Sequence, residues 1–422
     1  MRRPVLLLLL AAATLCPTVQ TGAADGTSTL AVPGHSNQWH WAAADRSFVA
    51  VAWGAQTEGG KPDVFVAVSR DGGQHFDQPV RANDVVGEAR VGGELPPRIA
   101  LVPKPGLDPE IVVVYGANAT TTAIKVVRSR DGGRTFSAGR ALQAIDAAGD
   151  RGWHALAVDA TGAAHVMWLD HRGLATGKAE SHTNHESAAM DGAQMAQRSG
   201  LYYASADAGV PEREVLNGVC YCCKVAMVTG RDNAIFAAWR QVYPGNIRDI
   251  AFSSSRDGGK HFAAPTRVST DNWQLAGCPD DGPALVTDGA GTIHAVWPTV
   301  IGGEKPEGAL FYASSRDGRT FSPRTRVPTL GSPRPMHPQV AFDAQGRVVV
   351  GWDEVISGVR QAAMRTITFD QAGQPAFGVI ARLGAPGEPS SYPMFVPASS
   401  GLLAVYASGA PGASVIRVTA AR

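Results

Sequence analysis

The sequence SRDGGQHF at residues 69–76 occurs, with small changes, three more times along the chain. The other copies are SRDGGRTF at 129–136, SRDGGKHF at 255–262 and SRDGRTF, one residue shorter, at 315–321. In such a stretch the aspartate accepts backbone N–H bonds in a tight turn, a glycine permits positive φ, the serine caps the turn, and the aromatic ring packs between strands. The residues expected to build these turns are Ser69, Asp71, Gly73, Phe76, Ser129, Asp131, Gly133, Phe136, Ser255, Asp257, Gly259, Phe262, Ser315, Asp317 and Phe321.

Each copy follows a stretch that alternates like a strand, and two further series of strands run in step with it. In one of them, short apolar runs end in Trp or Tyr about every 59 residues, from Trp53 to Tyr406. Four short strands per unit, repeated around an axis, predict an all-β protein, a β-propeller of four-stranded blades. Seven blades are favoured, with six as the alternative. The last unit lacks a fourth strand, which residues 28–33 can supply, closing the ring.

The first 24 residues have the pattern of a secretory signal peptide. Arg2 and Arg3 precede an uncharged apolar run, and the small residues Gly22 and Ala24 suit a cleavage site. We therefore expect one propeller domain over residues 25–422, secreted or periplasmic and with no transmembrane span. The 38 Lys and Arg nearly cancel the 37 Asp and Glu, so a nucleic-acid partner is not expected. A monomer is expected.

With these turns the chain resembles the Asp-box, or BNR-repeat, superfamily of sialidases (neuraminidases) over almost its whole mature length. PPRIALVPKP resembles the strand that supplies a carboxylate-binding arginine, here Arg98, and KVAMVTGRDNAIFAAWR resembles a strand pair ending in a second arginine, here Arg240. PSSYPMFVPASSGLLAVY resembles the last blade with its nucleophilic tyrosine, here Tyr392. The resemblance implies arginines that pair with a sugar carboxylate and a tyrosine that attacks an oxocarbenium-like centre.

The resemblance also places the active site on the face opposite the Asp turns, where the innermost strands begin. Residues at these strand starts would ring a central funnel that holds a glycan or another small anionic ligand. Besides Arg98, Arg240 and Tyr392, the candidate ligand-binding residues are His40, His154, Lys224, Asp281, Arg334 and His337.

Catalysis by such a site needs an acid that the resemblance does not supply. The loop YGANATTTAIK at residues 115–125, where the family carries an acid/base aspartate, has no carboxylate. Without an acid, departure of the leaving group loses a contribution of about 10²–10⁴-fold. Three interpretations stay open: an exo-α-sialidase-like glycosidase, a non-catalytic propeller that binds a glycan or another partner, and a periplasmic protein that binds a soft metal such as copper. The acids that other loops offer are Asp63, Asp170, Asp280, Asp353 and Glu354.

The mature chain has four cysteines, and three of them lie in GVCYCCKVAM at residues 218–227. Cys220, Cys222 and Cys223 precede one blade and Cys278 precedes the next, so all four should meet at one edge of the funnel. They can form two disulfides in one of three pairings, bind copper or zinc through thiolates, or carry redox chemistry. A long neighbouring loop adds soft or nitrogen ligands for a metal site: His171, His182, His185, Met190 and Met195.

Overall fold

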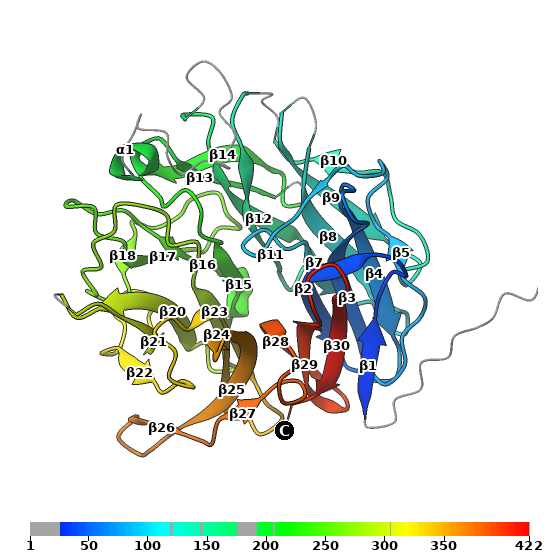
Figure 1. The fold of residues 1–422 in the computed structure, drawn as a ribbon. Coiled ribbons are helices and arrows are strands. Elements are labelled where there is room, and N and C mark those ends of the chain that lie inside the picture. The colour runs from blue at the N-terminus through cyan, green and yellow to red at the C-terminus, as the bar shows by residue number, and fades with distance from the viewer. Residues whose placement is uncertain are drawn as a thin grey trace, which may run out of the picture.

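Seven antiparallel sheets surround a central axis in the computed structural model of the protein (Figure 1). The structure describes residues 26–118, 121–143, 147–174, 192–205, 207–303 and 305–421. The predicted signal peptide, residues 1–24, lies outside this part of the chain. The β-propeller prediction is confirmed, and with seven blades the alternative of six is wrong.

Blades 1 to 4 follow one another along the chain, and each runs from its innermost strand outwards. Blade 1 contains β2 (Ser36–Asp45), β3 (Phe48–Gln56), β4 (Asp63–Ser69) and β5 (Val80–Arg81). Blade 2 contains β7 (Arg98–Val102), β8 (Glu110–Ala117), β9 (Ala123–Ser129) and β10 (Arg140–Ala141), and β6 (Ala89–Arg90) also pairs with β8. Blade 3 contains β11 (Arg151–Val158), β12 (Ala164–Asp170), β13 (Gly200–Ser205) and β14 (Val210–Asn217). Blade 4 contains β15 (Ala226–Thr229), β16 (Ile235–Arg240), β17 (Ile250–Ser255) and β18 (Thr266–Arg267).

The last three blades complete the ring. Blade 5 contains β19 (Ala284–Thr287), β20 (Ile293–Ile301), β21 (Glu307–Ser315) and β22 (Thr325–Val327). Blade 6 contains β23 (Met336–Phe342), β24 (Val348–Ile356), β25 (Val359–Phe369) and β26 (Pro375–Phe377), with β27 (Ala381–Arg382) also on β25. Blade 7 contains β28 (Ser390–Ala398), β29 (Gly401–Ser408), β30 (Val415–Ala420) and β1 (Thr27–Leu30).

Helix is confined to α1 (Gly192–Gln197) and a 3₁₀ turn at Arg231–Asn233 within the described residues. No helix in this part of the chain is long and apolar enough to cross a membrane.

The N-terminal strand closes the ring, as the sequence predicts. β1 pairs antiparallel with β30, from Thr27 opposite Thr419 to Leu30 opposite Ile416. Leu30 is buried in the apolar cluster between blades 7 and 1. The pairing therefore joins the two ends of the chain by backbone hydrogen bonds and by packing.

Seven hydrophobic clusters of the described residues fill the gaps between neighbouring blades, one in each gap, and a smaller eighth contains Cys220, Cys222 and Cys223. The aromatic residues that end the second strands lie in these gaps and are fully or almost fully buried, which confirms their prediction as core residues. Each tryptophan among them also donates its indole N–H to a side chain, as Trp53 does to Asn37 at 2.9 Å. These aromatic residues are Trp53, Tyr115, Trp168, Trp239, Trp297, Trp352 and Tyr406.

The SRDGG turns stabilise the rim of four of the seven gaps. In the first copy the Ser69 hydroxyl donates to Asp71 at 2.7 Å and accepts the backbone N–H of Gly73 at 2.9 Å. Gly73 has φ of 90°, and a Cβ there would lie 2.7 Å from Leu403 of blade 7, so the turn requires glycine. Phe76 packs on the cluster between blades 7 and 1. Phe136, Phe262 and Phe321 pack in the same way on the gap before their own blade.

Replacing Leu30 tests the closure. We expect Leu30→Ala to lower the free energy of unfolding by about 2–5 kcal/mol, because the substitution leaves a cavity in a buried cluster. Leu107→Ala is the matched control, since Leu107 is 73% exposed, and it should change stability by less than about 0.5 kcal/mol. Urea denaturation measures both. Equal, small effects of the two substitutions would contradict closure by β1.

Candidate functional site

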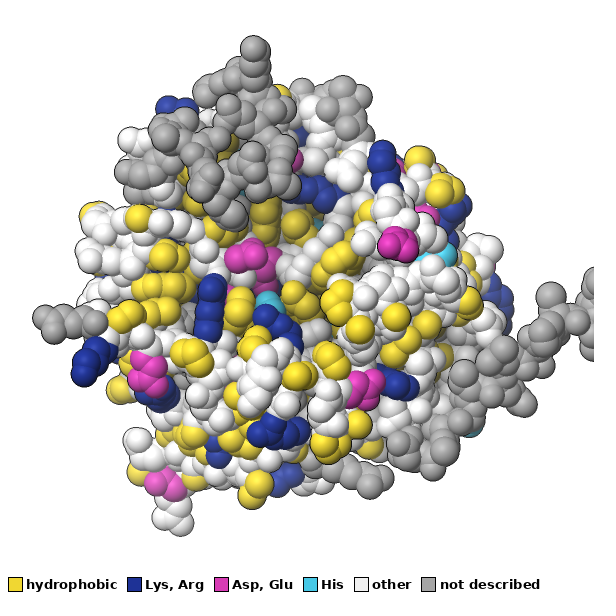
Figure 2. Space-filling model, in the orientation of Figure 1, with side chains coloured by type: hydrophobic (Ala, Val, Ile, Leu, Met, Phe, Trp, Pro, Cys, Tyr) yellow, Lys and Arg dark blue, Asp and Glu magenta, His cyan; other side chains and the backbone are white. Residues whose placement is uncertain are grey.

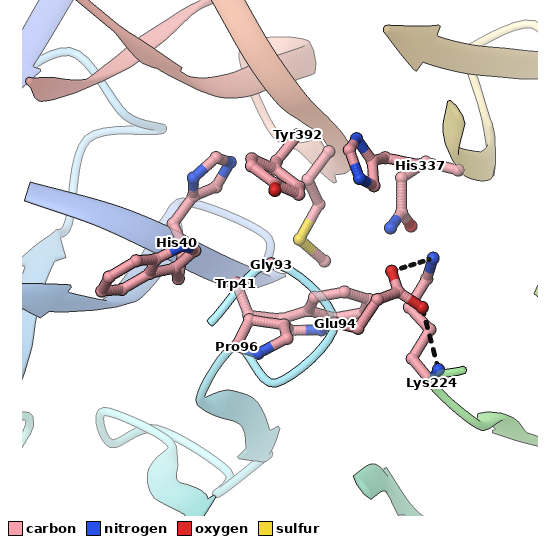
Figure 3. Close-up of a pocket in the computed structure, with 11 residues that line it drawn as sticks. His40, Trp41, Gly93, Glu94, Pro96, Lys224, His337 and Tyr392 are labelled. Carbon is pink, nitrogen blue, oxygen red and sulfur yellow. Dashed lines mark hydrogen bonds and ion pairs between the residues drawn. The ribbon is translucent and has the colours of Figure 1, made fainter. Parts of the chain in front are cut away.

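The innermost strands converge on the propeller axis, and a pocket lies at one mouth of the central channel (Figures 1 and 3). The enclosed space of about 20 Å³ holds little more than one water molecule. A larger ligand would therefore lie over the pocket with one substituent inside it. The pocket is lined by Trp39, His40, Trp41, Gly93, Glu94, Pro96, Lys224, His337, Gln339, Tyr392 and Met394.

The backbone turns several of these side chains towards the axis. In five blades the residue at or just before the start of the innermost strand has a left-handed conformation, with φ between 51° and 54°. Four of the five strands carry a β-bulge at this point, which bends the strand and redirects the side chains. Bulky residues rarely adopt this conformation, and such strain clusters at functional sites. The five residues are Trp39, Trp153, Asp280, His337 and Tyr392.

A buried ion-pair network forms one side of the pocket (Figure 3). Lys224 Nζ lies 3.1 Å from Glu94 Oε1 and 3.5 Å from Asp281 Oδ1, and the Lys224 backbone N–H donates to Glu94 Oε2 at 2.9 Å. Burial alone would lower the pKa of Lys224, but the charges of Glu94 and Asp281 outweigh it and raise that pKa. Burial raises the pKa of Asp281, and the charge of Glu94 adds to the rise. Lys224 is thus a permanent cation held by two carboxyl groups.

His337, Asp353 and Tyr392 form the other side. His337 Nδ1 bonds to Asp353 at 2.8 Å, the Tyr392 backbone N–H donates to the same carboxylate at 2.7 Å, and the rings of His337 and Tyr392 lie 4.1 Å apart. Burial favours neutral His337, but the Asp353 charge outweighs it and raises the pKa of the imidazole. Burial and the charges of Asp353 and Glu94 raise the pKa of Tyr392. The phenol therefore stays protonated at neutral pH. A Cβ at position 93 would overlap this hydroxyl, so the close approach of residue 93 to Tyr392 requires glycine.

The two predicted carboxylate-binding arginines do not point into this pocket. Arg240 is buried and donates to the backbone carbonyls of Arg248, Asp281 and Pro298, at 2.8 to 3.0 Å. Arg98 donates through Nε to the His154 carbonyl at 2.9 Å and stacks 3.7 Å from the Trp41 ring. It lines a neighbouring cavity of about 360 Å³ along the inner strands, which shares Trp41, Lys224 and Gln339 with the pocket, and burial lowers its pKa to about 9. Arg240 is thus engaged by backbone carbonyls, while Arg98 lines the neighbouring cavity, and carboxylate binding by either arginine stays a prediction.

Two of the candidate histidines also serve the fold. His40 donates through Nε2 to the Val405 carbonyl and His154 to the Val114 carbonyl, each at 3.1 Å. Both carbonyls belong to the second strand of the preceding blade, so the imidazoles bridge neighbouring blades. Burial lowers the pKa of His40 to about 4 and that of His154 to about 3. Both rings are neutral and bridge neighbouring blades, and His40 also lines the pocket, so ligand binding by these residues stays a prediction.

Three of the candidate acids make structural contacts away from the pocket. Asp170 pairs with Arg151 at 3.0 Å, Glu354 accepts the Trp352 indole N–H at 2.7 Å, and Asp63 accepts the Asn83 amide at 2.7 Å. Asp353 lies in the network with His337, and the exposed Asp280 has its pKa raised by partial desolvation and by the charge of Glu94. Glu94 was missed from the sequence, because it lies in an irregular loop between β6 and β7. The sequence signal that could have indicated it is the acidic residue in VGGELPP, directly before the strand that begins at Arg98.

Arg334, the remaining candidate, is exposed and donates to the Pro279 carbonyl at 2.8 Å. Arg360 pairs with Asp353 and keeps about a third of its side chain exposed. In the space-filling view, acidic side chains and a histidine occupy the centre of this face, with basic side chains beside them (Figure 2). The mouth of the channel is therefore strongly polar, with charges of both signs.

The cysteines lie beside this network. Cys222 and Cys278 form a disulfide, while Cys220 and Cys223 are free and buried. The structure thus has one disulfide among these four cysteines, where the sequence allows two. Burial alone would raise the pKa of the Cys220 thiol, but a hydrogen bond with Cys223 and the charges of Arg248 and Arg240 lower it to about 6.

The predicted histidine and methionine ligands do not join the cysteines where the structure describes them. His171 packs against Trp153, with ring centroids 4.9 Å apart, and Met195 lies in α1. His182, His185 and Met190 lie outside the described residues.

No protein-family model and no curated protein matches the sequence. A Dyadobacter fermentans protein of unknown function is similar in structure, with a TM-score of 0.50, 12% identity, and 94% of this chain and 100% of that chain covered. A PL25 ulvan lyase has a TM-score of 0.54 at 10% identity, covering 93% and 95%. A Hadza microbial sialidase has a TM-score of 0.49 at 17% identity, covering 86% and 73%.

The chain is a seven-bladed β-propeller of the kind found in these proteins. Sialidases are among the solved structures similar to the chain, and the predicted propeller architecture is confirmed by its own seven sheets. Identities this low show the fold alone, and one fold serves many functions.

The His337–Asp353 pair predicts a specific pH dependence. Because the folded-state pKa of His337 is raised above the ordinary value of about 6.5, its stabilising charge is fully present below that pH and is lost as pH rises through the folded-state pKa. We expect the free energy of unfolding, measured by urea denaturation, to fall as the pH rises above about 6.5 and through the folded-state pKa of His337. His337→Gln should remove this slope. His75→Gln, at a histidine whose side chain is 72% exposed, should keep it; an unchanged slope in His337→Gln would contradict the pairing.

Proposed function

We propose that the mouth of the channel around Tyr392 binds an acidic glycan. The observation that carries this proposal is the pocket itself, where aromatic rings stand beside buried, charged hydrogen-bonding groups. Trp39 and Tyr392 offer flat apolar surface for the C–H face of a sugar ring, while Glu94, Lys224 and Gln339 offer acceptors and donors for hydroxyl groups. Such a mixture suits a sugar better than a purely apolar ligand.

The charges at the mouth favour a ligand that carries an anionic group. The charge of Arg334 acts on Asp280, and Arg360 pairs with Asp353. Both guanidinium groups are accessible, and guanidinium binds carboxylate or sulfate through two parallel hydrogen bonds. The buried Glu94–Lys224 pair leaves no free cation inside the pocket, so the anionic group would lie at the rim. The related propeller described as an ulvan lyase is bound to a glycan of glucuronate and sulfated rhamnose, which supports only the capacity of the fold for such a ligand.

The proposal includes export of the protein. The Arg2–Arg3 and apolar pattern of residues 1–24 is that of a signal peptide, and the Cys222–Cys278 disulfide suits an oxidising compartment. A monomer outside the cytoplasm would meet extracellular polysaccharides directly.

A glycosidase is the second candidate, and one observation favours it. Tyr392 and Glu94 line the same pocket, so a phenol and a carboxylate face one bound sugar. The raised pKa of Tyr392 makes it a hydrogen-bond donor or proton source at neutral pH rather than a nucleophile. Arg98 and Arg240, which the sialidase resemblance assigned to the substrate carboxylate, are used by the blades.

Calorimetric titration with paired glycans tests binding. We expect sialyllactose and a glucuronate-containing tetrasaccharide to bind, and lactose and the carboxyl-reduced tetrasaccharide to bind more weakly. Arg334→Ala should weaken the acidic ligands about tenfold, since one charged contact of about 1.4 kcal/mol is lost, and should spare the uncharged ones. Arg382→Ala, an exposed arginine on β27 at the outer edge of the same blade, is the matched control and should change nothing.

Release of sugar from the same ligands is measured in parallel. Binding without turnover supports the proposal, and turnover that Tyr392→Phe abolishes would establish the glycosidase instead. If no acidic glycan binds, or if Arg382→Ala weakens binding as much as Arg334→Ala, the proposed site is wrong.

A further inference from the structure

The three cysteines of the CYCC sequence form a triangle of sulfur atoms outside the proposed glycan site. The Sγ atom of Cys220 lies 3.8 Å from that of Cys222 and 3.7 Å from that of Cys223, and the last two lie 4.0 Å apart. All three side chains are buried. A point equidistant from the three sulfurs lies about 2.2 Å from each, close to the metal–thiolate distance of about 2.3 Å found for zinc.

A bend in the backbone brings these sulfur atoms together, which an extended strand would not do. Neighbouring residues of a strand point to opposite sides, so Cys222 and Cys223 would be separated in regular β-structure. Residues 221–223 instead form a bend between an isolated bridge at Val219 and the start of β15. The bend brings three soft donors to one side within a protein interior.

Two buried arginines supply the matching charge. Arg248 is fully buried, and its Nη1 donates to Cys220 Sγ at 3.3 Å. Arg240 is also buried, and its charge acts on both Cys220 and Cys223. Three thiolates with one monovalent cation carry a net charge of −2, which two guanidinium groups balance. A buried cluster of that charge would otherwise be costly.

The number of donors selects the ion. Among the described residues, no histidine, carboxylate or further cysteine lies close enough to all three sulfurs to join them as a fourth donor, and Cys278 groups instead with Cys222 and Asp280. Zinc in structural sites takes four ligands, whereas thiolates favour Cu(I), which accepts three in a plane. A planar centre at the middle of the sulfur triangle fits the measured separations.

We propose that Cys220, Cys222 and Cys223 bind one Cu(I) ion when the Cys222–Cys278 disulfide is reduced. A dithiol reductant supplies two electrons and two protons, cleaves the disulfide into two thiols and itself becomes a disulfide. Binding of Cu(I) then forms three Cu–S bonds and displaces to solvent whatever protons the three sulfurs still carry. The Cys222–Cys278 disulfide and the metal compete for the same sulfur, so the oxidation state of the protein controls the site.

Titration with Cu(I) held by a chromogenic chelator tests this. The full mature protein is reduced with a dithiol without oxygen, freed of the reductant and mixed with the coloured complex. We expect it to remove one equivalent of copper, and the unreduced protein to bind at least 100-fold more weakly. Native mass spectrometry should show one copper per chain, and bound copper should protect Cys220 and Cys223 from alkylation.

Single substitutions locate the ion. Cys278→Ser leaves Cys222 as a thiol and should bind one Cu(I) without reduction, whereas Cys220→Ser and Cys223→Ser should lose binding after reduction. Failure of both the reduced protein and Cys278→Ser to take copper would overturn the proposal, as would undiminished binding in Cys220→Ser. Tighter binding of one Zn²⁺ than of Cu(I), measured with a zinc chelator, would overturn the assignment to copper. The reduced unsubstituted protein decides the question even where a variant fails to fold.

Discussion

Closure of the ring is the constraint on which the rest of the structure depends. Seven separate sheets bury their faces only against each other, so each gap between blades needs a neighbour on both sides. The pairing of β1 with β30 provides the last neighbour and brings the two ends of the chain together in one blade. Once the ring is closed, the starts of the innermost strands must converge on the axis, and the candidate site lies there.

Residues near the starts of the innermost strands connect this scaffold with the site. Trp39 and Trp153 adopt left-handed conformations, and the histidine after each bridges to the preceding blade through a backbone carbonyl. At His337 and Tyr392 the same backbone conformation presents the side chain to the pocket instead. The same local bend thus recurs in several blades. In some it positions a histidine that links two blades, and in others it positions a side chain in the polar pocket. The proposed glycan contacts rest on rigid strands, which keeps them preorganised.

Much of the fold could be predicted from the sequence, and less of the site. Repeated turns and aromatic strand ends are local patterns, so blade number and closure follow from counting. The strand starts also indicated Lys224, His337 and Tyr392. The sequence places Arg98 and Arg240 in strands but could not show which groups their guanidinium groups reach, because partners such as the His154 and Pro298 carbonyls lie in the neighbouring blade. Glu94 lies in a loop without periodicity, and four cysteines allow several pairings, of which packing selects one.

A crystal structure with a bound acidic oligosaccharide tests the central claim most directly. The account predicts a sugar ring over Trp39 and Tyr392, one substituent in the small pocket beside Glu94 and Lys224, and the anionic group next to Arg334 or Arg360. A ligand bound on the face of the SRDGG turns, or on the outer strands with the pocket empty, would contradict it.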